Sequence, residues 1–143
     1  MNVSSILKVK GKSVATAGPE DTLEAIAKRL AERRIGAIVI VEEGGQVAGI
    51  ISERDIIRAL SQNGSGALVL PVGEVMTKDV MTCNETSTID QMMAVMTQGR
   101  FRHVPVVQDG ALVGIVSIGD VVKHHIAEVE MEMTAMRDYL ATG

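Results

Sequence analysis

A serine hydroxyl and a carboxylate stand three residues apart at two places in the chain, as Ser52 with Asp55 and as Ser117 with Asp120. In both places a glycine and a short run of β-branched residues come first, and apolar residues at helical spacing follow. This pattern predicts a strand that runs into a helix N-terminus. Free backbone N–H groups and the positive end of the helix dipole gather there, so such a junction can receive a phosphate. A carboxylate at the same junction can only accept hydrogen bonds.

The same spacing also fits a capping box, in which the serine is the N-cap and the aspartate occupies the third helical position. Capping and ligand binding can coexist, so the motif alone leaves both interpretations open. Asparagine caps helices well, and replacing either aspartate with asparagine would therefore cost a cap about 1 kcal/mol or less. Binding of a ligand through the carboxylate would suffer much more.

These motifs belong to an internal repeat that spans most of the chain and predicts an α/β (α+β) fold. Each copy has the order β-α-β-β-α and leaves one sheet face uncovered, so we expect the copies to form a pseudo-twofold pair with one shared core. The predicted divisions are repeat 1 at 3–65, repeat 2 at 71–125 and a helical extension at 126–143, with a linker at 61–66. The predicted elements are strands at 14–16 and 80–82, helices at 21–33 and 87–98, hairpins of 37–41 with 47–51 and of 103–107 with 112–116, and second helices from 53 and 118.

Composition excludes several classes of function. The 143 residues have a net charge of −4 and an aromatic content of 1%, which argues against a nucleic-acid partner. No apolar run is long enough to suggest a membrane span, and we expect a cytoplasmic protein. Cys83 is the only cysteine, so no internal disulfide forms, and we expect it to be a buried apolar residue.

Catalytic signatures are missing from the sequence. There is no phosphate-binding G-x-x-x-x-G-K motif, no G-x-S-x-G elbow and no cluster of metal ligands. His124 and His125 are adjacent, and we interpret them as part of a solvated helix face and not as a metal site. We therefore expect no enzymatic activity and no catalytic cofactor.

The last predicted helix extends beyond its counterpart in the first copy. Its apolar residues recur at alternating spacings of four and three, which is the pattern of a coiled-coil seam. Two interpretations remain open: the seam packs against its own domain, or it pairs with a second copy of the chain. The seam residues are Ile126, Val129, Met133, Met136 and Leu140.

The tandem β-α-β-β-α units, each closed by glycine, two apolar residues and S-x-x-D, resemble the CBS domain, a family named after cystathionine β-synthase. The strand at 102–107 also looks like the family's second strand. The resemblance covers residues 3–125. It implies a pair of domains that binds adenine-bearing ligands in clefts between the repeats, with AMP the first candidate, then NAD(H) and ATP, and S-adenosylmethionine as a further possibility.

The resemblance also implies roles for individual residues. The motif aspartate would accept hydrogen bonds from the ribose, and the motif serine would bind a phosphate at the helix start. Carried over onto this chain, site one would consist of Thr16, Gly36, Ala37, Ser52, Arg54 and Asp55, and site two of Thr82, Arg102, His103, Pro105, Ser117 and Asp120.

The two implied sites are unequal, because Arg102 and His103 of site two correspond to the neutral Gly36 and Ala37 of site one. We therefore expect ligands in both clefts with different affinities. The resulting prediction is a stand-alone regulatory or sensor module that forms a homodimer and reports to an unknown effector protein. The alternative is a ligand-independent dimerisation or scaffold module.

Overall fold

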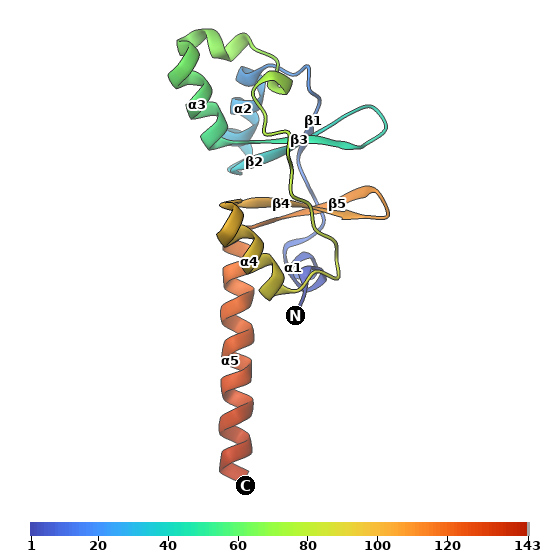
Figure 1. The fold of residues 1–143 in the computed structure, drawn as a ribbon, viewed down its shortest axis with the longest axis vertical. Coiled ribbons are helices and arrows are strands. Elements are labelled where there is room, and N and C mark those ends of the chain that lie inside the picture. Colours follow the sequence, from blue (N-terminus) through green and yellow to red (C-terminus); the bar gives the residue numbers. More distant parts are fainter. Residues whose placement is uncertain (143) are drawn as a thin grey trace.

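A computed structural model describes residues 1–142 and shows two α/β halves, one above the other, with a long helix leaving the second half (Figure 1). The first half contains a three-stranded sheet in the order β1-β2-β3, formed by β1 (Thr16–Ala17), β2 (Ala37–Val41) and β3 (Val47–Ser52). Strand β1 is parallel to β2, and β3 is antiparallel to it. The expected α/β fold of two repeats is confirmed.

Helices α2 (Leu23–Arg33) and α3 (Glu53–Asn63) cover this sheet. Thr22 caps α2 by accepting a hydrogen bond from the N–H of Ala25 at 3.2 Å, as expected for a threonine at the N-cap. The apolar face of α2 then packs onto the strands, with Leu23 and Ile26 fully buried.

The second half repeats this plan with a shorter sheet. Helix α4 (Ile89–Gly99) packs against the hairpin of β4 (His103–Gln108) and β5 (Ala111–Ser117). The strand expected at 80–82 is wrong, because pairing is reduced to one parallel bridge between Cys83 and Val106. Cys83 is partly buried against the second core, and burial raises its pKa to about 11.

Two segments cross between the halves: the residues that follow α3 and a helix at the N-terminus. Sequence analysis predicted neither. The linker expected at 61–66 is instead the end of α3 followed by a 3-10 helix over Gly64–Val69, whose Ala67 is fully buried in the first core. The next turn, Val72–Glu74, also packs there through Val72.

At the other end of the chain, the unexpected helix α1 (Val3–Lys10) packs into the second core. The buried apolar residues therefore form two clusters and not the single shared core that we expected. This arrangement leaves room for polar side chains between the halves.

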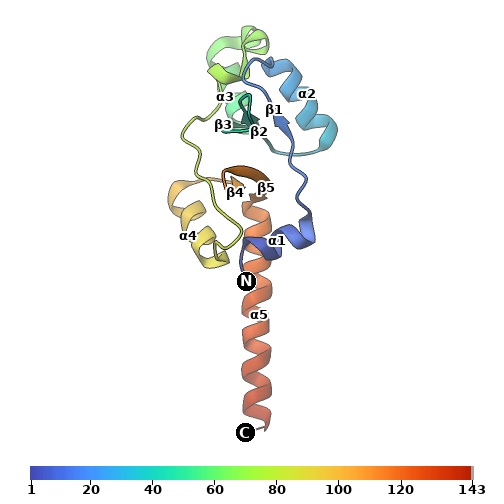
Figure 2. The ribbon, with the colours of Figure 1, turned by 90° about the vertical axis from the view of Figure 1, so that its right-hand side faces the viewer.

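Helix α5 (Ile118–Thr142) continues far beyond both halves in two perpendicular views (Figures 1 and 2). The seam residues are exposed, from 40% at Val129 to 69% at Leu140, so the interpretation that they pack against their own domain is wrong. Although α5 is 25 residues long, no helix within residues 1–142 has the length and apolarity required to cross a membrane.

Candidate functional site: a cleft between the repeats

A cleft of about 320 Å³ lies where the start of α3 faces the loop that leads into β4. This volume is at the lower end of the range of small-molecule sites. Both halves of the molecule contribute to its walls. Six of the twelve predicted site residues line this single cleft, and they come from both predicted sites: Gly36, Ser52, Arg54, Asp55, Arg102 and His103.

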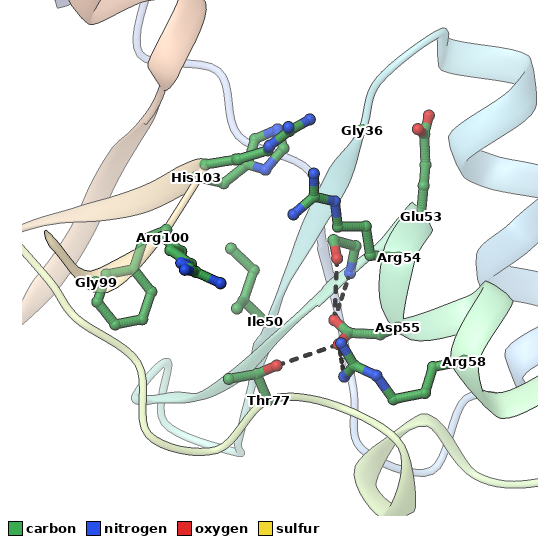
Figure 3. Close-up of a pocket in the computed structure, with 13 residues that line it drawn as sticks. Gly36, Ile50, Glu53, Arg54, Asp55, Arg58, Thr77, Gly99, Arg100 and His103 are labelled. Carbon is green, nitrogen blue, oxygen red and sulfur yellow. Dashed lines mark hydrogen bonds and ion pairs between the residues drawn. The ribbon is translucent and has the colours of Figure 1, made fainter. Parts of the chain in front are cut away.

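Asp55 is the buried charged residue of the cleft and is only 6% exposed. One carboxylate oxygen accepts hydrogen bonds from the backbone N–H of Ser52 at 2.9 Å and from its hydroxyl at 3.1 Å. The capping box is therefore real. The other oxygen accepts from the hydroxyl of Thr77 at 3.3 Å and lies 3.4 Å from the Arg58 guanidinium (Figure 3). This second oxygen is held by weaker contacts, and a ligand hydroxyl could replace them.

Positive charge dominates the walls of the cleft. Four arginines line it, against the two carboxylates of Glu53 and Asp55. Figure 3 shows Arg54 extending from the start of α3 toward His103 on the opposite wall. Guanidinium groups offer forked sets of donors, which match the oxygens of a phosphate. The arginines are Arg54, Arg58, Arg100 and Arg102.

His103 lies directly against Gly36, across the boundary between the halves. A Cβ atom placed on Gly36 would come within 3.2 Å of the His103 Nε2 atom, so a side chain at position 36 would push the ring aside. Burial lowers the pKa of His103, and the positive charge of Lys10 lowers it further. The nearby carboxylates of Glu53 and Asp120 act in the opposite direction. The imidazole is therefore neutral at pH 7.

The second motif forms a separate corner that does not line the cleft. Asp120 caps α5 by accepting from the N–H of Ser117 at 2.9 Å, and its own N–H donates to the Ser117 hydroxyl at 3.1 Å. The ammonium group of Lys10 lies 2.7 Å from the same carboxylate. Burial alone would raise the pKa of Asp120, but the hydrogen bonds from Lys10 and Ser117 outweigh it and lower that pKa.

The other four predicted residues do not line the cleft. Thr16 pairs with Val39 within the first sheet, and Ala37 is buried in β2. Pro105 is buried in β4, where its carbonyl accepts the N–H of Cys83 at 3.0 Å. Thr82 is exposed on the segment before Cys83. Their proposed contacts with a ligand stay predictions.

Sequence analysis missed residues that the fold brings to the two corners. Arg58 could have been found, because it lies one helical turn after Asp55. Thr77, Arg100 and Lys10 belong to no motif, and only the crossing segments and the loop before β4 bring them there.

Within residues 1–142 no group of three or more His, Cys, Asp or Glu side chains could hold a metal ion. The Nδ1 atom of His124 lies 2.9 Å from the backbone carbonyl of Asp120, one turn earlier in α5. His125 instead lies 3.6 Å from the carboxylate of Asp90. The two histidines therefore have separate local partners.

Comparisons with known proteins agree with this architecture. The family model described as "CBS domain" matches the chain twice, at residues 4–62 and 72–126. The mitochondrial CBS domain-containing protein CBSX3 of Arabidopsis thaliana is 34% identical over 149 aligned positions, which cover 99% of this chain and 72% of that protein.

Solved structures agree as well. The CBS-domain protein ATU1752 of Agrobacterium tumefaciens is 45% identical with a TM-score of 0.85, over 87% of this chain and 99% of that one. The CBS domain pair of protein MJ0100 is 32% identical with a TM-score of 0.79, over 90% and 98% of the two chains. That pair was solved in complex with 5′-methylthioadenosine and S-adenosyl-L-methionine.

Proposed function

The chain belongs to the CBS domain family, and on that premise we propose that it is a regulatory module that binds an adenine nucleotide in the cleft at Asp55. The observation that carries the proposal is a nearly buried carboxylate with one weakly held oxygen, in a cleft lined by four arginines. The carboxylate would accept hydrogen bonds from the ribose, and the arginines would bind phosphate. The adenosine-derived ligands of the MJ0100 pair support the adenine part of this proposal.

The charge of the cleft favours phosphorylated ligands over S-adenosylmethionine, whose sulfonium is positively charged. AMP, ATP and NAD(H) each place phosphate oxygens next to the ribose that Asp55 would hold. A cleft lined mainly by positive charge favours such contacts. We therefore rank AMP first among the candidates, followed by NAD(H) and ATP.

The proposed output is regulatory and not catalytic. CBS domain pairs are generally regulatory modules, and here the ligand would contact both halves of the molecule. A ligand that binds one relative arrangement of the halves more tightly biases the molecule toward it. Such coupling typically amounts to about 1–3 kcal/mol, which an effector protein could read.

Thermal unfolding with a panel of ligands tests the proposal. AMP, ATP, NAD⁺, NADH and S-adenosylmethionine would each be added to the intact chain, with adenosine as the control that lacks phosphate. A ligand present at 100 times its dissociation constant adds about 2.7 kcal/mol to the free energy of unfolding. We expect the phosphorylated ligands to stabilise the protein more than adenosine does. Equal, negligible shifts for the whole panel would reject nucleotide binding.

Self-association through the α5 seam is a second candidate function, and the exposed apolar residues of α5 favour it. Ile126, Met133 and Leu140 take the a positions of a heptad, with Val129 and Met136 at d. A parallel pair would also place Glu132 of one helix near the partner subunit's Arg137. We propose that two copies pair there, with or without ligand.

Sedimentation equilibrium of the intact chain tests this pairing. The double variant Met133→Glu, Met136→Glu should be monomeric, because it would bury four charges in the seam of a dimer. The matched control is Met131→Glu, since Met131 is 62% exposed but lies outside the seam. A dimer that survives the double substitution would place the interface elsewhere.

A further inference from the structure

Lys10 occupies the corner formed by the second motif. Its ammonium group donates to the Asp120 carboxylate at 2.7 Å and to the backbone carbonyl of Ile115 at 3.0 Å. Both acceptors belong to the strand-to-helix junction that the family resemblance implies as the second ribose site. A ribose at this corner would compete with the lysine for the carboxylate.

The first corner differs at the equivalent contact. Thr77, from the segment that crosses between the halves, exchanges two backbone hydrogen bonds with Ile50, at 3.0 and 2.9 Å. Its hydroxyl then reaches Asp55 at 3.3 Å. Ile50 and Ile115 hold the same place in their motifs, directly after the glycine. Apart from Arg58 of the same helix, Asp55 thus meets a neutral hydroxyl where Asp120 meets a charged amine.

Packing holds Lys10 in this position. Lys10 is the last residue of α1, and three residues of that helix are buried in the second core, each at 2% exposure or less. Leu7 packs so closely on Gly114 that a Cβ atom there would lie 2.8 Å from the leucine side chain. Gly11 ends the helix at a φ of 96° and donates its N–H to the Leu7 carbonyl at 2.7 Å. The three buried residues are Val3, Ile6 and Leu7.

We propose that Lys10 is an internal occupant that closes the Asp120 corner, so that nucleotide enters only the Asp55 cleft until Lys10 leaves. This inference rests on the proposed function and refines it: the chain has one open nucleotide site and one closed by its own lysine. Lys10 decides the number of ligands bound and does not touch the ligand in the open cleft, whose lining does not include it.

The number of AMP molecules bound, measured by equilibrium dialysis of the intact chain, tests the proposal. The wild type should bind one AMP, and Lys10→Met should bind two, because methionine is an unbranched side chain without the terminal ammonium group and its charge. The second site gained in Lys10→Met should disappear again in the double variant Lys10→Met, Asp120→Asn. The matched control is Lys12→Met: Lys12 is two residues away, 65% exposed, and paired with Glu85 at 3.1 Å. The Lys12→Met variant should bind one AMP, as the wild type does.

Amine labelling tests the contact without any nucleotide. Under limiting acetylation, followed by mass spectrometry, Lys10 should react several-fold more slowly than Lys12, because two of its donors are engaged. Asp120→Asn should remove much of this protection, whereas Asp109→Asn, on the exposed turn of the hairpin, should not.

The outcomes separate the two proposals. A wild type that binds two AMP molecules, or a Lys10→Met variant that gains no site, would overturn the role of Lys10. Unprotected Lys10 in the ligand-free protein would do the same. If Lys10→Met binds AMP only at the Asp120 corner, and the wild type binds none, the nucleotide site at Asp55 is rejected while the closure by Lys10 stands.

Discussion

The two S-x-x-D corners have the same local chemistry and different surroundings. In both, the aspartate accepts the N–H of the motif serine at 2.9 Å and so begins a helix. Asp55 then faces Thr77 and a cleft lined by arginines, whereas Asp120 faces Lys10. A repeated motif therefore guarantees the cap, but the segment that crosses from the other half decides whether the carboxylate is available to a ligand.

Exchanging each aspartate for asparagine is the strongest test of this difference. Asp55→Asn should lower the affinity for AMP by roughly tenfold to a hundredfold, because a hydrogen bond to a charged group contributes about 1.5–3 kcal/mol. Asp120→Asn should leave that affinity nearly unchanged. Isothermal titration calorimetry measures both. Thermal unfolding serves as the control, since asparagine should preserve each cap. Equal losses of affinity would mean that the two corners act alike.

The arginines that line the Asp55 cleft give a second test, because their positive charge distinguishes this cleft from the Asp120 corner. Arg102→Gln should weaken AMP binding by roughly tenfold, as expected for the loss of one charge-assisted contact to phosphate. Binding of adenosine should be unaffected. Arg33→Gln, at the end of α2 and outside the cleft lining, is the matched control. A variant that weakens adenosine and AMP to the same extent would show that Arg102 does not contact phosphate.

His103 lines the Asp55 cleft, and the charges of Lys10 and Asp120 act on its pKa, so we expect ligand binding to depend on pH. Burial, assisted by the charge of Lys10, holds its pKa below 6.5 in the free protein. A bound phosphate would stabilise the protonated ring and raise that pKa, so binding should take up protons and tighten as the pH falls below 7. Titration calorimetry in buffers of different ionisation enthalpy measures this uptake. His103→Gln should abolish it, and uptake that persists in that variant must come from another group.

The acid stability of the Asp120 corner gives the smallest expected effect. The pKa of Asp120 is lower in the folded protein than its ordinary value of 3.8, because Lys10 and Ser117 donate to the ionised form. Its contribution to stability is therefore present above about pH 4 and is lost as the pH falls through the folded pKa. The difference in unfolding free energy between the wild type and Asp120→Asn should shrink over this interval. Chemical denaturation at pH 6 and pH 3 checks it, and a constant difference would argue against the ion pair.

Local signals predicted much of the fold. Helix α2 spans Leu23–Arg33 where a helix was expected at 21–33, and both hairpins lie within a residue of the expected strands. These features depend on neighbours in the sequence and on periodicity, so the chain specifies them without knowledge of its tertiary contacts. The strand expected at 80–82 failed because its pairing depends on distant partners, and only Cys83 meets Val106.

The sequence alone therefore determined the two repeats, the two S-x-x-D motifs at their strand-to-helix junctions and the apolar seam of α5, because periodicity and short spacings encode them. Only the tertiary structure decided that Arg102 and His103 share a cleft with Asp55, and that Lys10 reaches Asp120. The physical reason is that α1 packs into the second core, the segment after α3 packs into the first, and the loop before β4 faces the start of α3. Contacts made by such crossing segments join residues far apart in the chain, and no local pattern records them.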